Sequence, residues 1–248
     1  MIISPEHQLI FFKPLKCAGS SVEKALHPHL SQEALCTGGK NSTKGLASSW
    51  EYTPINNEFI EGDFIHFRFH QHVHPELFYQ KIKDKMKFSK YHHVTVIRNP
   101  WDTIVSYYWY MISLQEELYP PPHYELAWKI QDQDPIDVAQ QKFCKCVLTP
   151  SPIESMEEDN HMQIMPVLKY VAYYNEKMIH EKIDTFIRFE QLKDDFDNLC
   201  KRIGLPPQQL QHLKSNTRKL KKHYSWYYNE ETKNAVEESF SKIITRFK

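Results

Sequence analysis

Hydrophobic and polar positions along the 248-residue chain change repeatedly between a strand-like and a helix-like spacing. Three short apolar runs predict strands: Gln8–Phe12, His92–Ile97 and Asp184–Phe189. Each run precedes a segment whose apolar residues have helical spacing, namely Ser20–Leu26, Trp101–Met111 and Gln191–Ile203. Alternating strands and helices predict the α/β class, with a mainly parallel sheet covered by helices on both faces, in a single domain over 1–248.

Several helix ends carry recognisable signals. Asn99 is a good N-cap before Pro100, and Asp102 lies in the first turn, where negative charge is favourable. By the same reasoning a helix begins at Asp134-Pro135 and runs to about Val147, and Asn229 caps a last helix that continues to Phe247. Gly204 ends the predicted helix Gln191–Ile203.

Two segments are predicted to be loops. Residues 36–62 are rich in Gly, Ser, Thr and Asn, and residues 149–160 (TPSPIESMEEDN) are predicted to form an exposed acidic loop. The first loop and the aromatic segment 107–124 are candidates to line a substrate site. The alternative is that residues 36–62 are an ordinary surface loop and that residues 107–124 belong to the core.

The charge balance restricts the kinds of partner. The chain has 31 basic and 31 acidic residues, so no global field favours nucleic acid or an anionic membrane, and an anion site must be local. No apolar run is long enough for a membrane span, and the start of the chain lacks the basic region of a signal peptide. Five scattered cysteines are interpreted as reduced thiols, so we expect a cytoplasmic protein.

The stretch FFKPLKCAGSSVEKAL (residues 11–26) joins the first predicted strand to its helix. Backbone amides at a helix start, with a lysine beside them, are suited to binding an anion. The candidate residues are Lys16, Cys17, Ala18, Gly19, Ser20 and Ser21. The stretch is not a Walker A loop, because Gly-x-x-x-x-Gly-Lys-Ser/Thr is absent. The alternative is an ordinary strand–turn–helix with a surface lysine.

Arg98 and Ser106 form a second candidate site. Arg98 lies at the carboxyl end of a predicted buried strand, where ligands of open α/β sheets bind, and Ser106 lies about two turns into the next helix. A guanidinium fork and a hydroxyl could together hold a phosphate. The alternative is an arginine that pairs with Asp102 or a neighbouring acid.

Four histidines alternate at period two in residues 64–78, so on a strand they would share one face: His66, His70, His72 and His74. His-x-His-x-His can supply zinc ligands, but no fourth ligand is evident nearby. We therefore favour a neutral histidine that removes a proton from a hydroxyl.

The one strongly basic run is KSNTRKLKKHY, residues 214–224. It is either a solvated charged loop or a segment that folds over a bound polyanion.

The order of these pieces resembles the sulfotransferases that use 3′-phosphoadenosine-5′-phosphosulfate (PAPS). In that family a Pro-Lys-x-Gly/Ala-x-Ser-Ser/Thr loop after the first strand holds the 5′-phosphosulfate, and Lys13–Ser21 is similar to it, with Leu15 where proline often stands. A second signature, Arg-x-Pro with Ser eight residues after the Arg, binds the 3′-phosphate. Arg98 and Ser106 match its spacing.

Within the family the resemblance is strongest to carbohydrate sulfotransferases of the heparan sulfate 2-O-sulfotransferase type. Their His-Gly-His-Val segment is similar to His70-Gln-His-Val73, which points to His72 as the base and leaves His70 and His74 as alternatives. Their late Lys-Ser-x-x-Arg-Lys stretch is similar to Lys214–Lys219 and implies nucleotide contacts for Arg218 and Lys219. The segments Phe189–Leu192 and Tyr224–Thr232 also resemble this family.

The resemblance implies a P-loop-like, nucleotide-kinase-like three-layer fold and in-line transfer of a sulfuryl group from PAPS to an acceptor hydroxyl. The acceptor would be a carbohydrate or a small metabolite, the product nucleotide would be PAP, and no metal or nucleic acid would take part. His72 would act as base and Lys16 would stabilise the leaving 5′-phosphate. Two alternatives are an ATP-dependent P-loop-type kinase and a non-catalytic module that binds phosphate or sulfate ligands.

Overall fold

The computed structural model describes residues 1–37, 72–82, 84–118, 128–154, 162–211 and 217–247. The chain divides into two compact units, each made of two chain segments. Unit 1 comprises Met1–Arg98 and Lys177–Lys214, and unit 2 comprises Asn99–Glu176 and Ser215–Lys248. The single domain over 1–248 stays a prediction, and each unit is described by itself.

Unit 1 is built on a five-stranded sheet with the order β3-β1-β2-β4-β7. The strands are β1 (Ile2–Ser4), β2 (Leu9–Phe12), β3 (Leu35–Cys36), β4 (His92–Ile97) and β7 (Thr185–Arg188). β2, β4 and β7 are parallel, with Phe11 opposite Val94 and Val96 opposite Ile187, whereas β1 is antiparallel to both its neighbours. The three predicted strands are confirmed. β1 and β3 were not predicted, because runs of three and two residues carry no periodicity.

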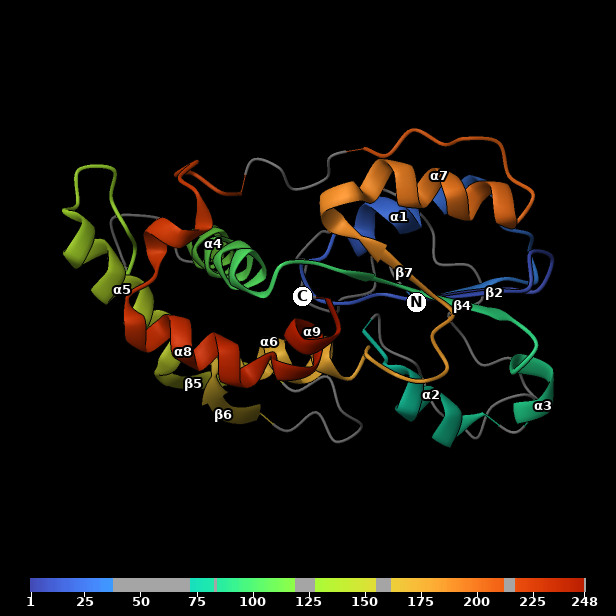
Figure 1. The fold of residues 1–248 in the computed structure, drawn as a ribbon, viewed down its shortest axis with the longest axis horizontal. Helices are drawn as coiled ribbons and strands as arrows, with labels where there is room; N and C mark the ends of the chain where they lie inside the picture. Colours follow the sequence, from blue (N-terminus) through green and yellow to red (C-terminus); the bar gives the residue numbers. More distant parts are fainter. Residues whose placement is uncertain (38–71, 83, 119–127, 155–161, 212–216, 248) are drawn as a thin grey trace. The chain divides into compact units, whose positions relative to one another are not determined.

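Helices cover both faces of this sheet (Figure 1). Leu9 and Phe11 of β2 pack with α1 (Gly19–Leu26) and α7 (Leu192–Arg202) on one face. Ile10 and Phe12 point to the opposite face, where they pack with the side chains of α2 (Pro75–Lys81) and α3 (Lys85–Phe88). The short 3-10 turns η1 (His27–His29) and η2 (Phe189–Gln191) complete the unit. The predicted α/β class, with a mainly parallel central sheet flanked by helices, is confirmed.

Unit 2 is mainly helical. Its elements are α4 (Pro100–Leu118), α5 (Ile136–Leu148), β5 (Pro150–Glu154), β6 (Met162–Pro166), α6 (Val167–Glu176), η3 (Tyr224–Tyr227), α8 (Glu230–Ser239) and α9 (Ser241–Phe247). Aromatic side chains form its core: the Phe143 ring lies against Tyr108, Tyr227 and Tyr228, and Trp109 Nε1 donates to Tyr227 Oη at 3.0 Å. The described part of segment 107–124 therefore supplies core residues, Tyr107, Tyr108 and Trp109 among them.

Three predictions of element bounds were wrong. Residues 150–154 form β5, which pairs antiparallel with β6, where the sequence predicted an exposed loop. Local polarity could not reveal this strand, because its hydrogen-bond partners come from residues 162–166. α4 continues to Leu118 rather than ending at Met111, and the last predicted helix is divided at Phe240. The predicted loop 36–62 lies, except for residues 36 and 37, outside the described residues.

Within the described ranges, none of the helices combines the length and the hydrophobicity that crossing a membrane would require.

Candidate functional site

The loop between β2 and α1 has an unusual backbone conformation. Lys16 and Ala18 have φ angles of 59° and 58°, in the left-handed region that non-glycine residues rarely adopt. Ala18 is the N-cap of α1, and its carbonyl accepts from Ser21 N at 2.8 Å. The amides of Gly19 and Ser20 precede any intrahelical acceptor, so the loop presents N–H groups at a helix start. This arrangement is typical of a backbone anion site.

Lys13 anchors this loop to α1 rather than reaching a ligand. Its Nζ lies 2.6 Å from Glu23 Oε2, and the side chains of Lys13 and Glu23 are 5% and 0% exposed. Burial alone would raise the pKa of Glu23, but the charges of Lys13 and the amino terminus outweigh it and hold that pKa below its usual value. Lys13 packs so closely on Gly19 that a Cβ there would lie 2.6 Å from Lys13 Cγ.

His72 is bound to the same loop through one ring nitrogen. Its Nδ1 lies 2.9 Å from the carbonyl oxygen of Lys13. Because a carbonyl can only accept, Nδ1 carries the hydrogen and the neutral ring has its basic lone pair on Nε2. The side chain is buried. The structure therefore fixes the tautomer that a general base acting through Nε2 requires.

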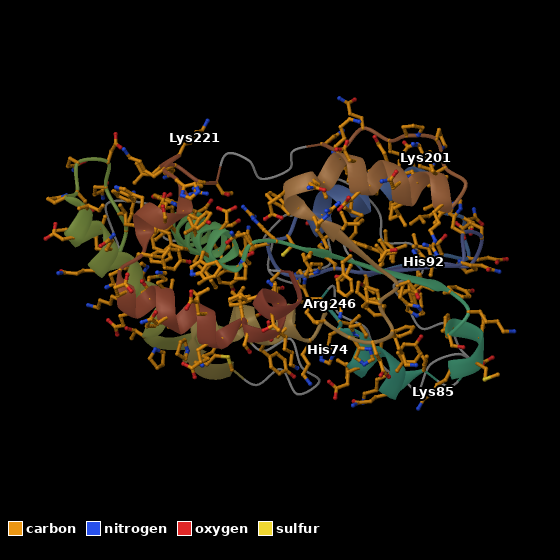
Figure 2. All side chains as sticks on the ribbon, viewed as in Figure 1. His74, Lys85, His92, Lys201, Lys221 and Arg246 are labelled. Carbon is orange, nitrogen blue, oxygen red and sulfur yellow. The ribbon has the colours of Figure 1, made fainter. Side chains whose placement is uncertain are left out.

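His74 has the opposite arrangement. It is the N-cap of α2 (Figure 2). Its Nδ1 accepts from Leu77 N at 3.2 Å, so the lone pair of the neutral ring is used within the fold. His72 lies in a turn and His74 precedes a helix, so these two residues are not on a strand on which they could share one face. The proline at position 75 starts a helix instead. His66 and His70 lie outside the described residues.

Arg98 follows β4 directly and supports the loop from its other side. Its Nη1 donates to the carbonyl oxygen of Lys16 at 2.7 Å, and its guanidinium lies 4.0 Å from the centroid of the Phe189 ring. Lys16 and Arg98 are thereby held together at the carboxyl edge of the parallel strands. The alternative partner considered for Arg98, Asp102, is bound to Arg218, with 2.8 Å between Oδ1 and Nη1.

In unit 2 the first turns of α4 hold another group of polar side chains. Asn99 Oδ1 accepts from Asp102 N at 3.2 Å, which confirms the predicted N-cap. Asp102 and Ser106 are four residues apart and share one helix face, so the Arg218 bound to Asp102 lies on the Ser106 side of α4. Trp101 Nε1 and Arg218 Nε are buried, and within the described residues neither has a hydrogen-bond partner. Buried donors without partners are rare, and a ligand with acceptor oxygens would satisfy them.

A family model described as the sulfotransferase family matches residues 1–247. The chain belongs to the sulfotransferase family. Neither the search of curated proteins nor the search of solved structures returned a match.

Family membership makes the chain a transferase of sulfuryl groups. The structure shows which of the predicted site residues lie close together within each unit. Unit 1 brings together the loop Lys16–Ser21, His72 and Arg98, while unit 2 brings Arg218 to the face of α4 that carries Ser106. Lys219 is held elsewhere, because its Nζ binds Glu116 at 2.6 Å, roughly 15 Å further along α4 than Ser106. The Cys17 side chain is buried and its Sγ faces the Leu15 carbonyl, so only its backbone could contact a ligand.

The described residues contain no group of three or more metal-ligating side chains that could hold an ion.

The sequence did not reveal which groups support this sulfotransferase site. The contacts of His72 and Arg98 are to main-chain carbonyls, which every residue carries, so no residue type signals them. A signal did exist for Glu23, because a charged residue beside the buried positions Val22 and Leu26 of a short helix requires a partner.

Proposed function

We propose that this sulfotransferase transfers a sulfuryl group from PAPS to a hydroxyl of a saccharide or small metabolite, with His72 as general base. The observation that carries the proposal is the hydrogen bond from His72 Nδ1 to the Lys13 carbonyl. It places a histidine with a basic Nε2 against the loop that the family resemblance assigns to the 5′-phosphosulfate. The resemblance to the heparan sulfate 2-O type suggests a carbohydrate acceptor and belongs to the proposal alone.

The donor would bind through two sets of groups. The amides of Cys17–Ser21, the hydroxyls of Ser20 and Ser21, and the Lys16 ammonium would hold the 5′-phosphosulfate. The left-handed φ angles of Lys16 and Ala18 support this role, because such residues in a turn are typical of backbone concavities that bind anions. Arg98, Ser106 and Arg218 would hold the 3′-phosphate, whereas the Lys219 ammonium is bound to Glu116. The unpaired Nε of Arg218 supports that assignment, since it is a buried donor available to an oxyanion.

The chain's own residues then account for the proton and the charge. PAPS supplies the activated sulfuryl group. An acceptor oxygen forms a bond to sulfur while the bond from sulfur to the 5′-phosphate oxygen breaks, and the acceptor proton passes to His72 Nε2. The Lys13 carbonyl, already bound to Nδ1–H, stabilises the imidazolium that results. Lys16 neutralises negative charge on the departing phosphate, as expected for a loose transition state governed by electrostatics.

Replacing His72 by Ala tests the base. Because general-base catalysis contributes about 10²–10⁴-fold, His72→Ala should lower turnover by that factor and leave PAP affinity within about twofold. Transfer of labelled sulfate to an acceptor panel and calorimetry of PAP binding measure the two quantities.

The matched control is His74→Ala, which removes the cap of α2 and should cost stability but not transfer. Retained turnover in His72→Ala, or loss of transfer confined to His74→Ala, would contradict the assignment.

Replacing Arg98 by Ala tests the nucleotide. Loss of a charge-assisted contact to the 3′-phosphate should weaken PAP binding by about tenfold or more, while AMP, which lacks that phosphate, should bind within about twofold of its original affinity. Arg188→Ala is the matched control, because that arginine is exposed and pairs with Asp195. Equal loss for PAP and AMP would show that Arg98 supports the loop instead of binding the 3′-phosphate.

The same calorimetry distinguishes the other classes. An ATP-dependent kinase, which family membership does not favour, would bind ATP with magnesium in preference to PAP and lose that binding in EDTA. A non-catalytic module would bind PAP but transfer no labelled sulfate to any acceptor.

A further inference from the structure

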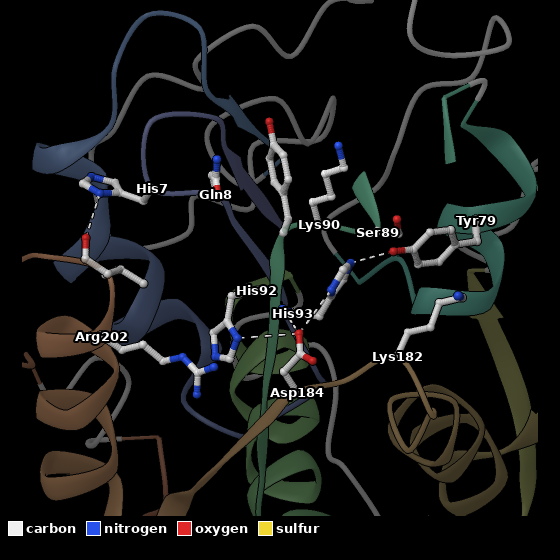
Figure 3. A pocket seen from close by; sticks show the side chains of 12 residues that line it. His7, Gln8, Tyr79, Ser89, Lys90, His92, His93, Lys182, Asp184 and Arg202 are labelled. Atoms are coloured by element: carbon white, nitrogen blue, oxygen red, sulfur yellow. Dashed lines mark hydrogen bonds and ion pairs between the residues drawn. The ribbon is translucent and has the colours of Figure 1, made fainter. Parts of the chain in front are cut away.

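Unit 1 contains a cavity of about 440 Å³ at the amino-terminal edge of its parallel strands (Figure 3). It opens where β4 and β7 begin, whereas Arg98 and the loop Lys16–Ser21 lie where these strands end. The length of β4 separates the two positions by roughly 16 Å. The cavity is thus distinct from the proposed donor site. Its volume is within the range of small-ligand pockets.

The floor of the cavity is a connected set of polar side chains. Tyr79 Oη lies 2.7 Å from His93 Nε2, and His93 Nδ1 faces Asp184 Oδ2 at 3.4 Å. The same carboxylate oxygen accepts from His93 N at 2.8 Å, and His92 Nδ1 lies 3.6 Å from it. One oxygen of the Asp184 carboxylate, Oδ2, therefore accepts from the backbone and faces two imidazoles.

Burial keeps these floor groups in their neutral forms near pH 7. It lowers the pKa of His93 although the charge of Asp184 opposes the shift, and it raises the pKa of Tyr79 to about 12, with Asp184 adding to the effect. Neutral Tyr79 can then donate to Nε2 of His93 while Nδ1–H points to Asp184. The floor is a prearranged polar surface on which one oxygen of the Asp184 carboxylate faces two imidazoles.

Three cationic side chains from three different elements line the same cavity. Lys90 comes from the turn before β4, Lys182 from the turn before β7, and Arg202 from the last turn of α7. Within the described residues none of their charged groups has an acidic partner. Lys182 lies over the Tyr79 ring at 4.7 Å, and Figure 3 shows Arg202 extending toward His92. The cavity is thus lined by three cationic side chains and one carboxylate, that of Asp184.

We propose that this cavity binds the sulfate or phosphate monoester group of a small molecule, with Arg202 and Lys182 as its main charge partners. A guanidinium matches a tetrahedral oxyanion through paired N–H donors, and the ammonium groups of Lys182 and Lys90 complete its neutralisation. The volume of about 440 Å³ leaves room beside the anionic group for an uncharged body about the size of one sugar ring. Since the whole chain has no net charge, the attraction is confined to this cavity and favours a small anion over an extended polyanion. The site does not depend on the identity of the sulfuryl donor.

Calorimetric titration of the full chain tests the site, with glucose 6-phosphate and glucose 6-sulfate as ligands and glucose as the uncharged comparator. Both esters should bind saturably with one site per chain, and glucose should not bind. The double variant Lys182→Gln with Arg202→Gln should weaken ester binding by about tenfold or more, because it removes two charge-assisted contacts. Both residues are exposed, so the fold should be retained, which circular dichroism checks.

Two control variants separate this site from its surroundings. Lys201→Gln removes the same charge from the neighbouring position of α7, which does not line the cavity, and should change ester affinity by less than about twofold. Arg98→Ala should also leave it unchanged. The proposal is overturned if neither ester binds, if Lys201→Gln weakens binding as much as the double variant, or if Arg98→Ala abolishes it and so places the ester in the donor site. Ester binding without PAP binding would contradict the proposed function alone.

Discussion

Lys13 serves the loop through two different atoms. Its ammonium forms a buried ion pair with Glu23, and its carbonyl accepts the hydrogen bond of His72. Removing one partner of a buried ion pair leaves the other charge uncompensated, so Lys13 and Glu23 hold each other in place. Because the Lys13 carbonyl binds His72, the position of the proposed base depends on this ion pair, although Lys13 need not contact substrate. Gly19 is part of the same arrangement, because Lys13 reaches Glu23 by passing over it.

Gly19→Ala should therefore be destabilising. The new Cβ would lie 2.6 Å from Lys13 Cγ, an atom near the base of a buried, ion-paired side chain that has little freedom to move. We expect a loss of about 1–3 kcal/mol in the free energy of unfolding, measured by urea denaturation.

Ala18→Gly is the matched control, since a glycine relaxes the left-handed φ of 58° and should leave stability unchanged or raise it. Equal losses in both variants would show that the loop tolerates no change of any kind, and would remove Lys13 from the explanation.

At the scale of single elements, the helix ends followed local rules closely. Asn99 and Asn229 were predicted as N-caps, and both side chains accept from the backbone N–H three residues later. The strand bounds were also close, because β-branched runs such as His92–Ile97 are continuous in sequence. The hairpin of β5 and β6 could not be predicted, since each strand acquires its hydrogen bonds from the other.

Asn229→Ala tests the capping of α8. Asn229 Oδ1 accepts from Thr232 N at 2.9 Å, and the substitution removes this bond. The other half of the capping box, from the backbone N–H of residue 229 to Thr232 Oγ1 at 3.1 Å, is kept. The free energy of unfolding should fall by about 0.5–2 kcal/mol. Asn234→Ala, at an exposed position inside the same helix, should leave stability unchanged or slightly higher. A comparable loss at position 234 would mean that asparagine removal, and not capping, is responsible.

At the scale of the whole molecule, the parallel sheet of unit 1 carries different chemistry at its two edges. Arg98 and the loop Lys16–Ser21 lie at the carboxyl ends of the strands, and the His93–Asp184 cluster lies at the amino ends. Each edge collects residues from distant parts of the chain. A local sequence pattern therefore reveals a candidate site only when the residues of that site lie at a strand end and in the loop that follows the strand.

The histidines at the amino edge should make stability depend on pH. Burial lowers the pKa of both His92 and His93, so the unfolded chain binds protons more readily than the folded one below the usual histidine pKa. The free energy of unfolding should thus be constant above about pH 6.5 and fall as the pH drops below it toward the lowered folded values. Urea unfolding from pH 8 to pH 5 measures this. His93→Gln should reduce the slope, and a slope unchanged by that substitution would assign the effect to other groups.

The sequence by itself determined the three main strands, the helix caps and the loop that joins β2 to α1, because each depends on neighbours within a few positions. Arg98 was placed by the same kind of pattern, at the end of a buried strand. Only the tertiary structure decided that Lys13 is paired with Glu23, that Arg98 supports the Lys16 carbonyl, and that His72 has its basic lone pair on Nε2 while the lone pair of His74 caps a helix. The reason is physical: the tautomer of a histidine is set by the partner of its other nitrogen, and for His72 that partner is a main-chain carbonyl 59 residues away.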